Sequence, residues 1–365
     1  MRTVFVGAQE HPNGVNSYTY NLALELNNRG YSSFVMSFGS SNMEKDYKGV
    51  FIKQYKTYGG TILSLPLLYI KSLPYLIKHR REFDVIMYQT VTFSVVPSLI
   101  MRIFGVKTCS IIHSLAEDSP KHGKIMKRIL VASMRLALMF TNNLITVSHT
   151  KKEEVYKRYH KLCKVLPCGV FMPKERALNT DIIEKNGIKA GRFFLTIGRI
   201  DPIKNYEVLI DAFKQHNHGD YQLVIGGDTN NEYGKIVKAR AKGCNNIIFT
   251  GIVSGDAKLE LLKNCMAYCL LSSSEGLPIA LLEGLSYGKI PIVTRIPSIM
   301  EVLEEYEIGL WSDVKNVGQV SANMELVENN QINAKKQGEI ARRIIENNYT
   351  WSKICDLYLD LIKGF

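Results

Sequence analysis

Short apolar segments of strand length alternate with helix-length segments along most of the chain, and this alternation constrains the fold more than any other feature. The strand-like segments are "TVFVGA", "SSFVMSF", "DVIMYQ", "CSIIHS" and "NLITVS" in the first half, and "RFFLTIGR", "YQLVIGG", "NIIFTG", "AYCLLSS" and "IPIVTR" in the second. Buried strands separated by helices are typical of parallel sheets covered on both faces. The pattern predicts an α/β protein with doubly wound parallel sheets.

The alternation stops near residues 168–192, a polar segment that contains proline and glycine. The chain has 365 residues, more than the usual size of one domain. We therefore expect two Rossmann-like domains, residues 1–170 and 171–348, and an amphipathic helix at 349–365. Ligands of such sheets bind beyond the carboxyl ends of the strands, so the expected site is a central cleft that the two domains face.

Two basic residues follow a predicted strand of the second half. The strand in "TIGRIDPIKN" ends at Gly198, and Arg199 and Lys204 come after it in one loop. Two cations at a strand end are suited to bind a diphosphate, although two solvated surface cations are the alternative. In the first half, His113 ends the strand in "IIHS", and Gly14 precedes a helix, where backbone N–H groups suit a phosphate. A structural histidine and an ordinary loop are the alternatives for these two residues.

Two glutamates stand among small and apolar residues in "SSSEGLPIALLEG". Glu275 falls in a loop after a predicted strand, and Glu283 falls more than one turn into the following helix. Carboxylates accept hydrogen bonds, so the two can bind hydroxyl groups such as those of a sugar and a ribose. A helix cap and a solvent-facing glutamate are the alternative, which explains poorly why Glu283 lies within "ALLEGL".

The order of these segments resembles one known family. "IGRIDPIKN", "LVIGGD", "IIFTGIVSGDAKLELLKNC", "SSSEGLPIALLEGLSYGKIPIVT" and "EVL" follow one another as in the retaining GT-B glycosyltransferases, the group 1 family with an E-x7-E element, which use nucleotide-sugar donors. The resemblance covers nearly the whole chain and is strongest over residues 193–303. It implies a GT-B fold and a retaining, metal-independent hexosyltransferase.

The resemblance also implies a role for each matched residue. Arg199 and Lys204 would neutralise the donor diphosphate, Glu275 would contact the transferred sugar, and His113 would face that sugar near the reacting carbon. The implied donor-binding residues are Gly14, Gly227, Gly276, Leu277 and Glu283. The last helix of the family packs back on the first domain, and we expect Trp351 near that crossing as a packing residue.

The chain departs from the family at several matched positions. Asn205 stands where a glycine often follows the loop lysine, and Gly284 stands where many members have alanine. The sequence shows no DxD-type metal motif, so we expect no metal and no cofactor. The expected substrates are a nucleotide-diphosphate sugar, with a UDP-sugar favoured, and a glycan or lipid-linked acceptor of bacterial surface polysaccharide.

The net charge is concentrated in the first half of the chain. Residues 1–170 carry 23 Lys and Arg against 10 Asp and Glu, whereas residues 171–365 carry 23 against 24. In segment 121–140, the basic residues Lys121, Lys124, Lys127, Arg128 and Arg135 fall within an arc of about 120° on a helical wheel. Such a helix suits an anionic membrane surface, and a sheet-covering helix with a solvated basic face is the alternative.

Two other classes of protein remain as alternatives. A basic protein that binds nucleic acid or membrane without transferase activity would account for the charge, but no recognition-helix, zinc-finger or RNP-type pattern occurs. A dehydrogenase needs G-x-G-x-x-G after the first strand, and "GAQEHPNG" does not supply it. We therefore expect no nucleic-acid partner.

The sequence also bears on location. "MRTVFVGA" is interpreted as a strand rather than a signal peptide, and the seven cysteines show no CxxC pair. The apolar segment "TILSLPLLYIKSLPYLI" is interrupted by Pro66, Lys71 and Pro74, short of the ~20 residues of a spanning helix. We expect a cytoplasmic protein without disulfides, with contact to the inner face of the cytoplasmic membrane left open.

Overall fold

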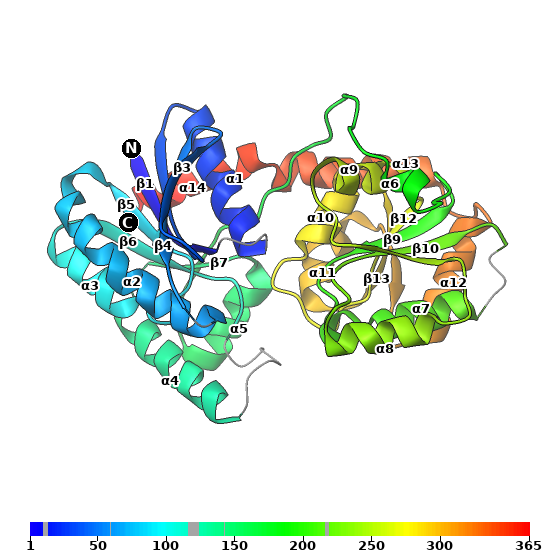
Figure 1. Ribbon diagram of the computed structural model, residues 1–365, viewed down its shortest axis with the longest axis horizontal. Helices are drawn as coiled ribbons and strands as arrows, with labels where there is room; N and C mark the ends of the chain where they lie inside the picture. Colours follow the sequence, from blue (N-terminus) through cyan, green and yellow to red (C-terminus); the bar gives the residue numbers. More distant parts are fainter. Residues whose placement is uncertain (10–13, 59, 116–123, 142, 216–218) are drawn as a thin grey trace. The chain divides into compact units, whose positions relative to one another are not determined.

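The structure is a computed structural model that describes residues 1–9, 14–58, 60–115, 124–141, 143–215 and 219–365. It divides the chain into two α/β units, each with its own sheet (Figure 1). The first unit comprises Met1–Gly169 and Trp351–Phe365, and the second comprises Val170–Thr350. The units begin and end within two residues of the expected bounds. Val170 and Thr350, the first and last residues of the second unit, pair as an isolated parallel bridge.

The sheet of the first unit has eight strands in the order β3-β4-β2-β1-β5-β6-β7-β8. Their bounds are β1 (Arg2–Gln9), β2 (Ser32–Gly39), β3 (Met43–Tyr47), β4 (Val50–Lys56), β5 (Val85–Tyr88), β6 (Lys107–Ile112), β7 (Leu144–Thr146) and β8 (Lys164–Val165). All neighbouring strands are parallel except β3 and β4, which are antiparallel. The sequence pattern did not indicate β3, β4 or β8, because β3 is polar and largely exposed and β8 has only two residues.

Helices bury both faces of this sheet. They are α1 (Gly14–Asn28), α2 (Gly60–Lys78), α3 (Val95–Ile103), α4 (Lys124–Phe140), α5 (His149–Tyr159) and α14 (Trp351–Lys363). Side chains of β1 alternate between the faces: Val4 and Val6 pack with residues of α2 and α3, whereas the ring centroid of Phe5 lies 6.3 Å from that of Tyr358 in α14. Figure 1 shows α14, in red, beside α1.

Three details correct or complete expectations from the sequence. Pro66 and Pro74 do not interrupt secondary structure, because α2 continues through both. Among the helices that the structure describes, none is sufficiently long and apolar to cross a bilayer. Trp351 is 2% exposed, and a Cβ on Gly169 would lie 2.7 Å from its ring, as expected for a packing residue.

The sheet of the second unit has six parallel strands in the order β11-β10-β9-β12-β13-β14. Their bounds are β9 (Phe193–Ile197), β10 (Gln222–Gly226), β11 (Ile247–Gly251), β12 (Ala267–Leu270), β13 (Ile290–Thr294) and β14 (Leu310–Ser312). Five of them coincide with the apolar segments of the sequence. The sixth, β14, has three residues and was not predicted.

Helices also cover this second sheet on both faces. They are α6 (Ile182–Lys185), α7 (Tyr206–Lys214), α8 (Glu232–Ala241), α9 (Gly255–Asn264), α10 (Ile279–Ser286), α11 (Pro297–Leu303), α12 (Val317–Glu328) and α13 (Ala334–Ile344). Phe194 and Cys269 join a core formed with α7 and α12, whereas Tyr268 lies under α10 at Gly284. The carboxyl ends of the six strands therefore lie along one edge, which the loops to the helices follow.

Candidate functional site

Two loops at the carboxyl edge of the second sheet bring Lys204 and Glu275 together. Lys204 follows β9 and Glu275 follows β12, which is hydrogen-bonded to β9 in the sheet. Lys204 Nζ lies 2.5 Å from Glu275 Oε1, and the two side chains are only 17% and 12% exposed. The sequence predicted both residues as site residues but gave no sign that they would form an ion pair.

Asn205 ties the two loops to each other. Its Nδ2 donates hydrogen bonds to the carbonyl oxygen of Leu271, at 2.7 Å, and to Ser273 Oγ, at 2.8 Å. The N–H of Ser273 in turn donates to the carbonyl oxygen of Ile203 at 2.8 Å. Asn205 has φ +53°, a left-handed conformation that glycine and asparagine adopt most readily. Asparagine, which stands here in place of glycine, therefore tolerates this left-handed conformation, and its side chain adds two hydrogen bonds.

The Glu275 carboxylate is also held from its own loop. Ser272, which is fully buried, donates its hydroxyl proton to Glu275 Oε1 at 2.5 Å. Thr294 Oγ1 donates to the carbonyl oxygen of Ser272 at 2.6 Å, which fixes this residue against β13. One carboxylate oxygen thus receives an ammonium and a hydroxyl group, and hydrogen bonds of this charge-assisted kind are stronger than neutral ones.

Arg199 remains outside this ion pair. Its side chain is 68% exposed, and its Nη1 is 3.8 Å from Asp201 Oδ2. Asp201 is nearly buried, and its Oδ1 accepts the N–H of Ile203 at 3.3 Å. Arg199 is thus a largely solvated guanidinium with one long contact, a group that binds phosphate or carboxylate oxygens with two parallel hydrogen bonds.

Glu283 is paired with a lysine that the sequence analysis did not single out. Glu283 is the fifth residue of α10, and its Oε1 lies 2.6 Å from Nζ of Lys258, a residue of α9. The side chains of Glu283 and Lys258 are 28% and 26% exposed. The sequence could have indicated Lys258 only by its position, since α9 follows β11 at the same edge of the sheet. Lysines are common on the surfaces of such helices, so this position alone did not mark it as a site residue.

Two glycines of the second unit allow close packing. A Cβ on Gly227 would lie 2.2 Å from the carbonyl oxygen of Gly198, and the Gly227 N–H already donates to Gly251 at 2.8 Å. Gly227 therefore lets neighbouring strand ends approach each other, and its N–H is used within the protein. A Cβ on Gly284 would lie 2.8 Å from Cγ of Tyr268, which explains why glycine replaces alanine here.

The loop between Glu275 and Glu283 is part of the same edge. Leu277 is 9% exposed, and its carbonyl oxygen accepts the N–H of Ile279 at 3.0 Å. Pro278 occupies the N-cap of α10. The role of the Gly276 and Leu277 backbone in binding a ligand stays a prediction.

In the first unit, His113 and Gln89 lie at the ends of adjacent strands. A hydrogen bond of 3.2 Å joins His113 Nε2 and Gln89 Oε1, and the Tyr18 ring and the imidazole meet in a T-shaped arrangement at a centroid distance of 5.2 Å. Burial lowers the pKa of His113 to about 4, so the imidazole is neutral at pH 7. Gln89 is fully buried, and its Nε2 has no hydrogen-bond partner within the described residues. The sequence analysis did not single out Gln89, although its position directly after β5 could have indicated it.

Gly14 is the first residue of α1 and is exposed. Residues 10–13, which include the rest of the predicted phosphate loop, lie outside the described residues. The described part of the turn is fixed by Asn16, which accepts the N–H of Gln9 at 2.7 Å and donates to its carbonyl oxygen at 2.8 Å. The diphosphate-binding role of Gly14 stays a prediction.

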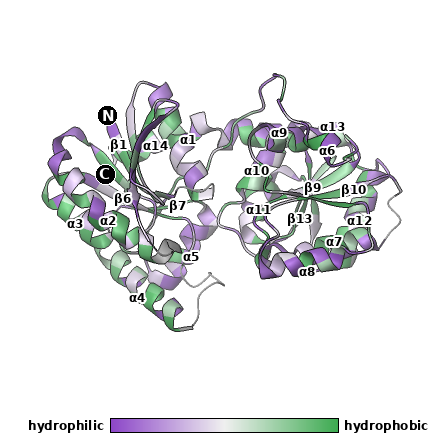
Figure 2. Cartoon of the chain, viewed as in Figure 1, coloured by the Kyte–Doolittle hydropathy of each residue, from purple (hydrophilic) through white to green (hydrophobic). Residues whose placement is uncertain are grey.

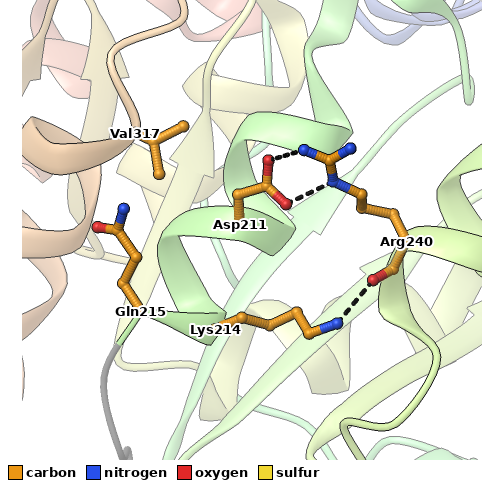
Figure 3. A pocket seen from close by; sticks show the side chains of 5 residues that line it. All are labelled: Asp211, Lys214, Gln215, Arg240 and Val317. Atoms are coloured by element: carbon orange, nitrogen blue, oxygen red, sulfur yellow. Dashed lines mark hydrogen bonds and ion pairs between the residues drawn. The ribbon is translucent and has the colours of Figure 1, made fainter.

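A separate pocket lies among α7, α8 and α12 and contains none of the predicted site residues (Figure 3). It is lined by Asp211, Lys214, Gln215, Arg240 and Val317. Arg240 contacts both carboxylate oxygens of Asp211, and Lys214 donates to the carbonyl oxygen of Arg240 at 2.9 Å. Because none of the residues that the sequence singled out lines this pocket, it is a weaker candidate than the edge that carries Lys204 and Glu275.

No group of three or more His, Cys, Asp or Glu side chains suited to a metal ion occurs within the described residues. Two cations, Arg199 and Lys204, instead occupy the loop after β9. Whether the site works without a metal ion stays a prediction.

Comparison with known proteins supports the sequence-based family assignment. Residues 179–351 match the family model described as "Glycosyl transferases group 1", and residues 12–171 match the one described as "Glycosyltransferase Family 4". The O-antigen chain mannosyltransferase C of Escherichia coli is 23% identical over 99% of this chain and 98% of its own length. The D-rhamnosyltransferase WbpZ of Pseudomonas aeruginosa is 30% identical over 47% of this chain and 44% of its own length.

Solved structures give the same result for the fold. Anabaena HepE in complex with UDP-glucose superposes with a TM-score of 0.78 at 17% identity, covering 100% of both chains. The sucrose-phosphate synthase of Thermosynechococcus elongatus gives 0.81 at 15% identity, again over 100% of both chains. The predicted fold class is confirmed. The chain belongs to the group 1 glycosyltransferases and has the GT-B fold.

Proposed function

We propose that the chain is a retaining, metal-independent hexosyltransferase of bacterial surface-polysaccharide biosynthesis that acts in the cytoplasm. Its donor is a nucleotide-diphosphate hexose or N-acetylhexosamine, with a UDP-sugar favoured, and its acceptor is a glycan or lipid-linked glycan. The observation that carries the proposal is the Lys204–Glu275 pair at 2.5 Å. The pair places an ammonium group and a carboxylate side by side at the carboxyl edge of the second sheet. A ligand with a diphosphate and a sugar needs a cation for the one and a hydrogen-bond acceptor for the other.

The ion pair suggests how the donor is received. A diphosphate carries more negative charge than one carboxylate, so it competes with Glu275 for the Lys204 ammonium. The solvated Arg199 binds a second group of phosphate oxygens. Glu275, released from Lys204 and still held by Ser272, then accepts hydroxyl groups of the transferred sugar. Glu283, oriented by Lys258, accepts the ribose hydroxyls.

The chemical step follows from these positions. The acceptor hydroxyl oxygen forms a bond to the anomeric carbon on the face from which the diphosphate departs. The bond between that carbon and the β-phosphate oxygen breaks, and the nucleoside diphosphate leaves with the electron pair. The acceptor proton passes to a leaving phosphate oxygen, so the anomeric configuration is retained. Lys204 and Arg199 stabilise the charge that develops on the leaving group, a contribution worth about 100-fold or more in rate for a single such group.

The names of relatives support the substrate classes and differ on the donor. The Escherichia coli relative is named an O-antigen chain mannosyltransferase and the Pseudomonas aeruginosa relative a D-rhamnosyltransferase, whereas HepE was solved with UDP-glucose. A relative from Komagataeibacter xylinus, 25% identical over 36% of this chain, is named for GDP-mannose. The base and the sugar of the donor are therefore the first quantities to measure.

A thermal-shift panel of UDP, GDP, ADP and their sugar conjugates, without added metal, tests the donor site. A ligand present at 100 times its dissociation constant adds about 2.7 kcal/mol to the free energy of unfolding. We expect a shift with one nucleotide family that is lost in Glu283→Ala. The matched control is Glu232→Ala, which removes the glutamate of an exposed pair with Lys235 at 2.7 Å. No shift with any nucleotide, or an equal loss in both variants, would refute the assigned donor site.

The stereochemistry is tested on the product. Transfer from an α-linked donor should give an α-linked product, which the anomeric proton coupling in NMR distinguishes from β. A β-linked product would contradict retention while leaving the donor site intact.

A further inference from the structure

The outer face of α4 carries apolar side chains. Ile125, Ile129, Leu136 and Met139 are 76%, 53%, 55% and 67% exposed. At about 100° per residue they fall within an arc of about 80°. The opposite face of α4 is also apolar and packs into the core of the first unit, through buried residues such as Met134. The helix therefore has one apolar face in the core and a second in solvent.

Basic residues lie along one side of this exposed apolar stripe. Arg128 and Arg135, both exposed, are about 20° apart on the helix and adjoin Met139. The sequence left open a helix whose outer face is basic and simply solvated. The structure differs, because the centre of the outer face is apolar and the arginines form its margin. Lys121 lies outside the described residues, as does the side chain of Lys124.

The end of α3 extends the same surface. Ile103 is 83% exposed and Phe104 is 45% exposed. Arg102 Nη1 donates to the carbonyl oxygen of Phe140 at 3.4 Å, which places the end of α3 beside the end of α4. Figure 2 shows hydrophobic and hydrophilic residues alternating along α4. We call the surface formed by Ile103, Phe104, Ile125, Ile129, Leu136 and Met139 the α3–α4 face.

The charges decide which partner suits this face. Neither α3 nor α4 contains an Asp or Glu residue. Exposed apolar patches of this kind mark interaction sites, and an apolar stripe bordered by arginines matches the interface of an anionic bilayer. A second copy of the chain fits less well, because a two-fold contact would bring Arg128 and Arg135 of both copies near one another.

We propose that the α3–α4 face docks the first unit on an anionic lipid bilayer. The helix α4 lies in the plane of the membrane surface, with Ile129 and Leu136 at the boundary between headgroups and acyl chains. Arg128 and Arg135 contact the lipid phosphates. A peripheral contact of this depth needs no spanning helix. The proposal is independent of the donor site.

Cosedimentation with sucrose-loaded vesicles of phosphatidylcholine and phosphatidylglycerol tests it. The variant Ile129→Ser/Leu136→Ser should lower the partition coefficient by about tenfold or more. The matched control is Ile236→Ser/Ile252→Ser, which replaces two isoleucines of the second unit that are 51% and 77% exposed. This control should bind as the wild type does. Thermal unfolding of both variants should stay near that of the wild type, because all four side chains are exposed.

A second experiment tests the role of the two arginines and of the lipid charge. Arg128→Gln/Arg135→Gln should weaken binding to the anionic vesicles by about 25-fold, from about fivefold for each charge, and have little effect on pure phosphatidylcholine vesicles. Undiminished binding by Ile129→Ser/Leu136→Ser would overturn the proposal. A second result would also overturn it: the wild type binds no vesicles but self-associates in sedimentation velocity, and Ile129→Ser/Leu136→Ser abolishes this self-association.

Discussion

The Lys204–Glu275 pair offers the sharpest test of the site. Replacing Lys204 by methionine keeps most of the side-chain volume and removes the ammonium 2.5 Å from Glu275 Oε1. Removing one partner of a fully buried ion pair costs about 3–5 kcal/mol, because the other charge is left unpaired. The side chains are 17% and 12% exposed, and Ser272 still donates to Glu275. We therefore expect Lys204→Met to lower the free energy of unfolding of the second unit by about 2 kcal/mol.

The assay must report on the second unit alone. The chain has two tryptophans, Trp311 in the second unit and Trp351 in the first. In a Trp351→Phe background, urea unfolding followed by fluorescence reports on the unit that contains Lys204. A double-mutant cycle with Lys204→Met and Glu275→Gln then isolates the energy of the contact.

We expect a coupling energy of at least about 1 kcal/mol in this cycle. The matched control is the same cycle at Lys235 and Glu232, which lie 2.7 Å apart but are 69% and 89% exposed. Exposed pairs of this kind contribute about 0.5 kcal/mol or less. A coupling energy for Lys204 and Glu275 no larger than that of this control would refute the view that burial makes their contact strong.

Three further predictions concern other parts of the molecule. Lys258→Met should raise the dissociation constant of the nucleotide about fivefold in titration calorimetry, because Glu283 loses an orienting hydrogen bond of about 1 kcal/mol; an unchanged constant would show that Lys258 plays no part. The pKa of His113 is about 4 in the folded state and about 6.5 in the unfolded state. Its contribution to the free energy of unfolding is therefore complete above pH 6.5 and is lost as the pH falls towards 4. Urea unfolding should show wild type losing about 1–2 kcal/mol more than His113→Gln between pH 6.5 and 4.5, and parallel pH profiles would contradict this. Gly284→Ala should lower the free energy of unfolding by about 1–3 kcal/mol, because its Cβ would lie 2.8 Å from the Tyr268 ring. An unchanged urea midpoint would contradict this and show that the Tyr268 ring moves aside without cost.

A matched control exists for the glycine substitution. Gly318 lies in α12, and a Cβ there would meet nothing closer than 3.8 Å. Gly318→Ala should therefore be neutral or slightly stabilising, since alanine favours helix more than glycine does.

The fold was largely predictable from the sequence because most strands are buried on both faces. Such strands are continuous apolar segments, and their alternation with helices leaves few arrangements open. The hairpin of β3 and β4 escaped prediction for the opposite reason. Its strand β3, "MEKDY", is mostly exposed at the sheet edge, so neither an apolar run nor an alternation marks it.

The sequence by itself determined which residues stand at strand ends, and thus the candidates Arg199, Lys204 and Glu275. Position along a strand is a local property, and the carboxyl ends of parallel strands must share one edge. Only the tertiary structure decided which of these candidates meet. Residues 204 and 275 come into contact because β9 and β12 are neighbours in the sheet, and Lys258 reaches Glu283 because α9 and α10 pack on the same side.

The same distinction holds for the first unit. The sequence predicted an amphipathic helix in segment 121–140 with its basic residues on one arc, since helical periodicity is a property of the chain itself, and the structure describes this helix from Lys124 to Phe140. It did not determine which of the two apolar arcs faces the core. That choice depended on how α4 packs against the sheet, because only contacts distant in the sequence remove one face from water and leave Ile129 and Leu136 in it.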